Sequence, residues 1–286
     1  MIKSFPKIVQ IQTSNKCNAA CNFCPYSYTE DKKKFKLMNW NLYKKIINEC
    51  SQHNVKEILP FFLNEPLLNK DLVKYIDYAK EKNPNALIKI FTNGSLLTDK
   101  ISNQLLDSKV DEVIFSFNGS TKEEYETFMK PLKFEKTKQR IESFIRFRGK
   151  RKIPAVAIHI LKLPDSNNFL FKLRDYWNKI GVTVHILKYE NRAGNVENYN
   201  LKSTFLMTKI PCDRLIKQAY IMVNGDVILC CADWKQEIIF GNLKDKTLFE
   251  VWNGNERMNF VKTHKELQFD KLKLCCDCNF NEISLN

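Results

Sequence analysis

The sequence predicts an α/β protein: a partial (β/α)6 TIM barrel followed by a small C-terminal domain. Its 286 residues suit one barrel-sized domain with an addition. Six short apolar runs alternate with helical patterns over residues 7–187, which is typical of a parallel sheet with right-handed crossovers. Since a closed barrel has eight such units, six units predict an open or partial barrel.

Each predicted strand is a short run rich in Ile, Val, Leu and Phe. The six strands are Lys7–Thr13, Glu57–Leu63, Leu87–Phe91, Glu112–Phe117, Ala155–Leu161 and Val182–Leu187. Helical patterns separate them, and the predicted helices are Asn41–Gln52, Lys70–Lys82, Asp99–Asp107, Lys136–Arg148 and Asn168–Ile180. This order is the pattern of successive βα units.

Polar residues follow every predicted strand. The first strand leads into a cysteine-rich loop, and the next three end at Asn64-Glu65-Pro66, Thr92-Asn93-Gly94 and Asn118-Gly119-Ser120. The last two strands lead into polar stretches at Pro164–Asn168 and Glu190–Asn195. Because ligands bind at the carboxyl ends of parallel strands, we expect one shared site there.

The pattern changes after about residue 205. Two short strands, Tyr220–Val223 and Val227–Cys230, flank Asn224-Gly225, which is a strong hairpin signal. Short helices are predicted over Leu248–Trp252 and Asn255–His264. Because this region has few regular apolar runs, we expect a metal to organise it. The predicted domains are therefore the barrel, residues 1–204, and a second domain, residues 205–286.

Composition narrows the function classes. Basic residues outnumber acidic ones by 46 to 32, a net charge of +14 that favours anionic partners. Only eight basic residues are Arg, the side chain best suited to phosphates and bases, so a nucleic-acid partner is not expected. The sequence has no apolar stretch long enough for a membrane span and no secretory signal at its start. We therefore expect a cytoplasmic protein with no membrane partner.

The ten cysteines fall into two groups and one isolated residue. The first group is Cys17, Cys21 and Cys24, and the second is Cys212, Cys230, Cys231, Cys275, Cys276 and Cys278. Cys50 follows Ile46 and Ile47 at helical spacing, which predicts a core position. Since the cytosol keeps thiols reduced, the grouping indicates two thiolate sites rather than disulfides.

The first group favours an iron–sulfur cluster over zinc. Cys17, Cys21 and Cys24 lie within eight residues, and no fourth thiol or histidine is near them. A structural zinc needs four protein ligands. A four-iron cluster held by three cysteines instead keeps one iron open for another ligand.

This CxxxCxxC spacing, with an aromatic residue before the last cysteine, resembles the radical S-adenosylmethionine (SAM) superfamily. The resemblance implies that Cys17, Cys21 and Cys24 hold a [4Fe-4S] cluster whose open iron binds the amino and carboxylate groups of SAM. It further implies that a reductant such as flavodoxin or ferredoxin supplies one electron. SAM then yields methionine and a 5′-deoxyadenosyl radical, which removes hydrogen from a substrate.

The resemblance also implies contacts to SAM at the strand ends. The superfamily usually has a Gly-Gly-Glu-type turn after the second strand, where this chain has Asn64 and Glu65 and keeps the acid that an ammonium group needs. Thr92 and Asn93 resemble a recurrent element beside the cofactor. Ser116 and Asn118 resemble the positions that hydrogen-bond the ribose.

Cys212, Cys230, Cys275 and Cys278 supply four further thiols, which suit either zinc or an iron–sulfur cluster. Together with Gly225, Gly241-Asn242-Leu243 and Trp252, they resemble the SPASM/twitch extension of radical SAM enzymes. A full SPASM domain has seven cysteines and two auxiliary clusters. The resemblance is therefore to the shorter twitch form, and it implies one auxiliary [4Fe-4S] cluster.

Within the superfamily the chain resembles the butirosin-pathway aminocyclitol dehydrogenase type. It shares the Asn-Glu-Pro-Leu-Leu turn, the Asn-Arg-small-Gly stretch and the cysteine layout. This resemblance implies oxidation of a sugar-like or aminocyclitol alcohol, with the auxiliary cluster as electron acceptor and Arg192 as a substrate contact. The base stays open among His159, Lys162, Lys188 and Tyr189.

Two alternatives are carried forward. Cys231 and Cys276 adjoin predicted ligands, and either thiol could donate a hydrogen atom to a substrate radical. The protein would then be an epimerase or a crosslinking enzyme acting on a ribosomal peptide or a sugar. The other alternative is a zinc-binding nucleic-acid module, but the sequence lacks the clustered aromatic residues that stack on bases.

Overall fold

The computed structural model describes residues 3–28, 34–163, 170–194 and 207–284. Nine strands form one sheet in the order β10-β9-β8-β1-β2-β3-β4-β5-β6. All six predicted barrel strands are present and run parallel to their neighbours. They are β1 (Ile8–Ile11), β2 (Glu57–Leu59), β3 (Leu87–Thr92), β4 (Glu112–Ser116), β5 (Ala155–Lys162) and β6 (Thr183–Lys188). The α/β fold with a parallel sheet is therefore confirmed.

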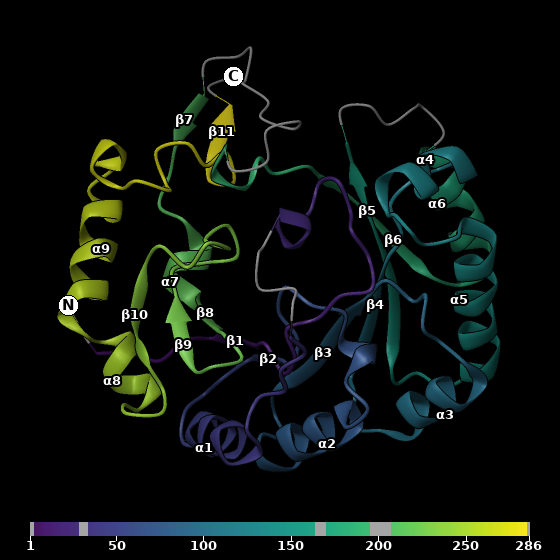
Figure 1. Ribbon diagram of the computed structural model, residues 1–286, viewed down its shortest axis with the longest axis horizontal. Helices are drawn as coiled ribbons and strands as arrows, with labels where there is room; N and C mark the ends of the chain where they lie inside the picture. Colours follow the sequence, from purple (N-terminus) through teal and green to yellow (C-terminus); the bar gives the residue numbers. More distant parts are fainter. Residues whose placement is uncertain (1–2, 29–33, 164–169, 195–206, 285–286) are drawn as a thin grey trace.

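Helices cover the outer face of the curved sheet, and the cysteine-rich loop lies on its concave side (Figure 1). The predicted helices are present as α1 (Trp40–Cys50), α2 (Leu72–Lys82), α3 (Asp99–Asp107), α5 (Phe134–Arg148) and α6 (Leu170–Lys179). The predicted start of α6 at Asn168 and the stretch Pro164–Asn168 lie outside the described residues. Two α-helices of the described residues were not predicted, α7 (Asp213–Lys217) and α4 (Lys122–Phe128). At the start of α4 the Thr121 hydroxyl accepts a hydrogen bond from the Glu124 amide.

Successive side chains of each strand point alternately into the core and toward the concave side of the sheet. On β3, Ile88 and Ile90 are fully buried in the core, while Lys89 and Phe91 line the cavity. Cys50 on α1 is fully buried in the same core, which confirms its predicted place. The sheet therefore presents one apolar face to the helices and one mixed face to the candidate site.

The C-terminal region continues the barrel sheet instead of standing apart from it. The predicted hairpin is present as β8 (Gln218–Ile221) and β9 (Asp226–Ile228), and β8 pairs in parallel with β1. Its turn needs glycine, since Gly225 has φ +96° and a Cβ there would lie 2.9 Å from the Asn242 side-chain oxygen. The predicted boundary between residues 204 and 205 lies outside the described residues and stays a prediction.

The remaining elements surround the second group of cysteines. They are β7 (Met207–Lys209), α7 (Asp213–Lys217), β10 (Ile239–Asn242), α8 (Leu248–Trp252), α9 (Asn255–Lys265) and β11 (Glu282–Ser284). β7 and β11 pair as a separate antiparallel sheet of two strands. In the part of the chain that the structure describes, no helix has the length and apolar character needed to cross a bilayer.

Candidate active site

A cavity of about 690 Å³ occupies the concave side of the sheet. A volume of this size accommodates a cofactor together with a small ligand. It brings together most of the predicted site residues: Cys17, Cys21, Cys24, Asn64, Glu65, Thr92, Asn93, Ser116, Asn118, Arg192 and Cys231. Cys276 does not line it. That residue is exposed, and its thiol donates to the Lys273 carbonyl at 2.9 Å, so the structure gives no support to Cys276 as a hydrogen donor.

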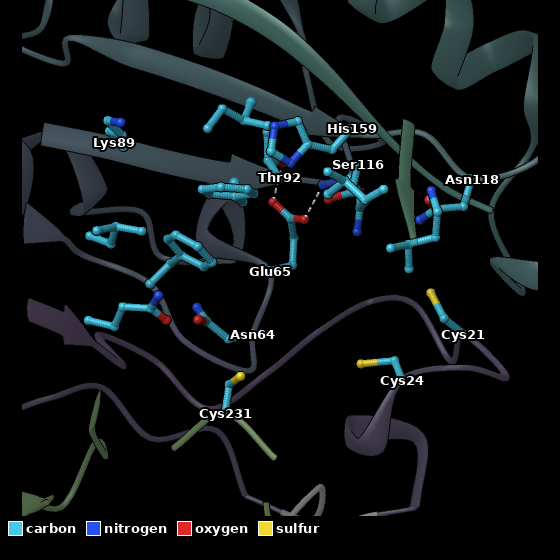
Figure 2. Close-up of a pocket in the computed structure, with 18 of the residues that line it drawn as sticks. Cys21, Cys24, Asn64, Glu65, Lys89, Thr92, Ser116, Asn118, His159 and Cys231 are labelled. Atoms are coloured by element: carbon cyan, nitrogen blue, oxygen red, sulfur yellow. Dashed lines mark hydrogen bonds between the residues drawn. The ribbon is translucent and has the colours of Figure 1, made fainter. Parts of the chain in front are cut away.

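The first cysteine loop is held by backbone contacts to the barrel. The amides of Ala20 and Asn22 donate to the carbonyls of Lys130 and Phe128 at 2.5 and 3.2 Å. Figure 2 shows the sulfurs of Cys21 and Cys24 turned toward the cavity. Burial raises the pKa of the Cys21 thiol well above its usual value, and the neighbouring Cys24 adds to the rise. The loop therefore favours thiolates only when a metal group supplies positive charge.

The donor set fits an iron–sulfur cluster better than a single ion. Within the described ranges, no three His, Cys, Asp or Glu side chains are grouped closely enough to bind one metal ion. One zinc would hold every sulfur at about 2.3 Å. In a four-iron cluster each cysteine ligates a different iron, so its sulfurs stand farther apart.

Glu65 is a buried carboxylate at the centre of the cavity wall (Figure 2). It is 2% exposed and accepts hydrogen bonds from the Thr92 hydroxyl at 2.5 Å and from the Asn93 amide at 2.8 Å. Burial nevertheless raises its pKa from 4.5 to about 7. No basic side chain in the described segments forms an ion pair with it, so its surroundings fit a ligand that carries an ammonium group.

The turn Thr92-Asn93-Gly94 joins Glu65 to the cysteine loop. The Asn93 side-chain amide donates to the Asn18 side-chain oxygen at 2.9 Å, and Asn18 lies next to Cys17. Gly94 has φ +71°, and a Cβ there would lie 2.9 Å from Ile141. Only glycine fits this turn without strain. The sequence placed this turn beside the cofactor by resemblance, and the structure shows that it connects Glu65 to the first cysteine loop.

Asn64 and Asn118 have structural hydrogen bonds as well as places on the cavity wall. The Asn64 side chain donates to the Ser14 hydroxyl at 2.9 Å and accepts from the Phe62 amide at 2.8 Å. The Asn118 side-chain oxygen accepts from the Leu161 amide at 2.8 Å and so joins the ends of β4 and β5. Both side chains are thus held in fixed positions at the ends of strands.

The structure also brings the second set of four cysteines together. Cys212, Cys230, Cys275 and Cys278 line one small enclosed cavity of about 30 Å³ with His264. The His264 Nδ1 atom accepts from the Cys212 amide at 3.4 Å, so its Nε2 atom carries the proton. Nε2 is buried and has no acceptor among the residues described here. A buried N–H without an acceptor fits a bound group that is rich in sulfur acceptors.

Three charged side chains form a wall between the two cavities, because Glu190, Arg192 and Arg214 line both of them. Arg214 binds both oxygens of Glu190 at 2.5 and 2.8 Å, and Arg192 lies 3.7 Å from the same carboxylate. An Arg192 nitrogen also lies 3.8 Å from the Cys231 sulfur. Sequence reasoning placed Glu190 at the expected site without giving it a role, and it missed Arg214, because an isolated charged residue carries no spacing signal.

Arg192 is held in an unusual backbone conformation. Its φ of +51° lies in the left-handed region, which is strained for a residue with a Cβ. The preceding residue, Asn191, donates from its side chain to the Asp277 carbonyl at 2.7 Å and from its amide to the Asn279 side chain at 2.9 Å. These bonds tie Arg192 to the second cysteine loop.

Of the four candidates for the base, His159 and Lys188 line the cavity, whereas Lys162 and Tyr189 are not among its lining residues. Burial lowers the pKa of His159 to about 4, and the nearby His185 and Lys89 contribute to this shift. His159 is therefore neutral at pH 7 and has a nitrogen free to accept a proton.

Two family models match the chain, one in the barrel and one in the C-terminal region. The model of the radical SAM superfamily matches residues 11–168, and that of the SPASM iron-sulfur cluster-binding domain matches residues 212–279. The chain belongs to the radical SAM superfamily. It therefore uses a SAM-binding [4Fe-4S] cluster and an auxiliary iron–sulfur cluster, as the resemblance predicted. The assignment of individual residues to these cofactors stays a prediction.

Relatives include enzymes with two kinds of substrate. The SAM-dependent 2-deoxy-scyllo-inosamine dehydrogenase of Niallia circulans is 24% identical over 95% of this chain and 92% of its own length. The crystal structure of BtrN in complex with AdoMet and 2-DOIA has a TM-score of 0.69 and 21% identity, over 97% of this chain and 94% of that chain. Streptococcus suis SuiB bound to the precursor peptide SuiA has a TM-score of 0.73 and 15% identity, over 91% and 67% of the two chains.

Proposed function

We propose that this protein is a radical SAM dehydrogenase that oxidises an alcohol group of a sugar-like or aminocyclitol substrate to a ketone. One observation carries the proposal: a four-cysteine site lies directly behind the wall of the main cavity, with Glu190, Arg192 and Arg214 lining both. The similarity to the Niallia circulans dehydrogenase along nearly the whole chain supports the same reaction class.

The residues divide into two cofactor sites. In the proposal Cys17, Cys21 and Cys24 hold the first cluster, and Glu65 accepts a hydrogen bond from the amino group of SAM. The ribose contacts are Ser116 and Asn118, with Asn64, Thr92 and Asn93 beside them. The auxiliary cluster is held by Cys212, Cys230, Cys275 and Cys278. When bound, these cofactors supply a radical that removes a hydrogen atom and a one-electron acceptor beyond the cavity wall.

The protein side chains supply the rest of an alcohol oxidation. Conversion of an alcohol to a ketone removes one hydrogen atom, one proton and one electron. Arg192 binds the substrate oxygen, because its guanidinium lies at the wall nearest the second site. His159 lines the cavity and can accept a hydrogen bond from the substrate hydroxyl, and because burial lowers its pKa to about 4 the proton is passed on to solvent. The aromatic and aliphatic lining, including Phe61, Phe91 and Leu161, limits water near the reacting carbon.

The reductant and the compartment complete the proposal. A small acidic electron carrier such as flavodoxin or ferredoxin suits a chain with a net charge of +14. None of the ten cysteines, all of which lie within the described residues, forms a disulfide. We therefore place the protein in the cytoplasm, where thiols stay reduced.

The experiment is an anaerobic assay of the reconstituted protein with SAM, a reductant and 2-deoxy-scyllo-inosamine or related polyols. The proposal predicts one ketone for each 5′-deoxyadenosine, and no ketone when Cys17 is replaced by Ala. Formation of 5′-deoxyadenosine with an unchanged oxidation state in every product would contradict dehydrogenation.

A second candidate is a radical epimerase, and the position of Cys231 favours it. Figure 2 shows the Cys231 sulfur on the cavity side opposite Glu65, and the residue lines the cavity. A thiol there can return a hydrogen atom to a substrate radical, after which one electron and one proton restore the thiol. Incorporation of solvent deuterium at one carbon, without a ketone, would select this reaction.

A further inference from the structure

Lys209, at the end of β7, makes an unusual set of contacts with the last cysteine loop. Its ammonium nitrogen lies 2.9 Å from the Cys275 carbonyl oxygen, 2.8 Å from that of Cys276 and 2.5 Å from that of Cys278. An ammonium group has three N–H donors, and here each one meets a carbonyl. The three bonds therefore satisfy Lys209 entirely on the backbone of one loop.

These contacts differ from those of an ordinary surface lysine. The Lys209 side chain is only 18% exposed, and the opposite strand β11 places Glu282 at 3.7 Å from its nitrogen. Holding a long flexible side chain in one place carries an entropic penalty, which the charge-assisted bonds offset. By contrast, Lys273, two residues before Cys275, is 77% exposed and binds a single carboxylate, that of Glu237.

The contacts act on the backbone that carries two of the four cysteines in the second site. Cys275 and Cys278 both line the small cavity, and the carbonyls of both are bound to Lys209. The loop is thus fixed at both ends of its Cys-x-x-Cys segment. Such fixation keeps the two sulfurs at a constant separation, which a metal cluster requires.

The positive charge of Lys209 also favours a bound cluster. A cluster with four thiolate ligands is anionic and becomes more negative when it accepts an electron. A positive charge close to the ligands stabilises the reduced state. Arg192 and Arg214 are further cations at this site, and the acids that oppose them include Glu190, Glu282 and Asp277 of the loop itself.

We propose that Lys209 is a positioning residue of the auxiliary site, where it clamps the Cys275–Cys278 loop and favours electron acceptance by the cluster. The inference rests on the proposed assignment of Cys212, Cys230, Cys275 and Cys278 to that cluster.

The test compares three variants of the full chain after anaerobic reconstitution. Lys209→Met removes the charge and the three bonds, Lys209→Arg keeps the charge, and Lys273→Met removes a nearby exposed charge as the matched control. Iron content and a redox titration followed by electron paramagnetic resonance are measured without substrate.

We expect Lys209→Met to make reduction of the auxiliary cluster about tenfold less favourable, a shift of 59 mV for one electron. The SAM-binding cluster stays unchanged, and Lys209→Arg and Lys273→Met stay within about twofold of the wild type. Selective loss of the auxiliary irons in Lys209→Met, with rescue by Lys209→Arg, equally supports the clamp.

Two results would overturn the inference. One is an iron content and a reduction equilibrium in Lys209→Met that match those of the wild type. The other is loss of both clusters and of helical circular dichroism in Lys209→Met and Lys209→Arg alike, which would assign the residue to folding alone. A separate variant, Cys278→Ser, tests the ligand assignment: full iron content there would refute the proposed site itself, whatever Lys209 does.

Discussion

Replacing Glu65 by Gln tests the proposed SAM site through a single charge. Burial raises the pKa of Glu65 from 4.5 to about 7, so ionisation of the buried carboxyl costs about 3 kcal/mol at 1.36 kcal/mol per unit. A bound amino group that donates to the carboxylate, and is polarised by the iron that it ligates, offsets this cost. A neutral Gln keeps the shape but replaces this charge-assisted hydrogen bond by a neutral one, a loss of about 3 kcal/mol. We expect Glu65→Gln to bind SAM about 100-fold more weakly.

The pH dependence of SAM binding tests the role of the Glu65 charge independently. In the wild type the carboxyl must lose its proton before it can accept this charge-assisted hydrogen bond from the amino group. Affinity is therefore full above about pH 7 and falls by up to tenfold for each pH unit below it. Glu65→Gln removes this dependence over that range.

Isothermal titration of the reconstituted protein with SAM measures both effects. Glu256→Gln, a change at an exposed position on α9, is the matched control and keeps wild-type affinity. An affinity of Glu65→Gln within about threefold of the wild type, or an unchanged pH profile in this variant, would refute the assignment of Glu65 to the amino group of SAM.

Three further predictions concern the Gly94 turn, Arg192 in the cavity wall and the Cys231 thiol. Gly94→Ala places a Cβ 2.9 Å from Ile141 at φ +71° and should lower the free energy of unfolding by about 3 kcal/mol in urea titration. Gly181→Ala, at φ +81° with nothing within 4 Å, should lower the free energy of unfolding by only about 1 kcal/mol. Equal losses in Gly94→Ala and Gly181→Ala would contradict the packing argument. Arg192→Gln should raise the KM for the alcohol at least about tenfold while SAM affinity stays unchanged; an unchanged KM would remove Arg192 from the substrate site. Cys231→Ala should leave ketone formation within about twofold of the wild type, whereas loss of all product turnover would favour the epimerase reaction.

The sequence predicted the elements whose signals are local. Each barrel strand is a short apolar run, and each cysteine pair or trio is defined by close spacing, so strands and sulfur groups were recognisable along the chain. The family models match residues 11–168 and 212–279, which contain the first and second groups of cysteines. α4 was missed because a helix of seven residues has too few turns to show a periodic apolar face.

Pairing between distant segments was not predictable. β8 joins the sheet beside β1, where Ile8 faces Gln218 and Ile11 faces Ile221. No local pattern signals a pairing across such a separation, so the hairpin was expected in a domain of its own. Likewise, the wall of Glu190 and Arg214 exists only because the loop after β6 meets α7 in space.

Adjacent cysteines show a second limit of sequence reasoning. Cys231 and Cys276 each stand beside a predicted ligand and have the same chemistry. The structure places Cys231 on the cavity wall and Cys276 on the exposed surface. Direction and exposure of a loop side chain depend on the backbone path, which residue spacing does not specify.

The most direct measurement is a single turnover of the reconstituted protein, with the substrate-derived electron counted by electron paramagnetic resonance. If a hydroxyl-bearing carbon is oxidised beside the second sulfur site, each new carbonyl group appears together with one electron on that site, and both vanish in Cys278→Ser. Carbonyl formation that leaves the second site fully oxidised, or that continues unchanged in Cys278→Ser, would contradict the account.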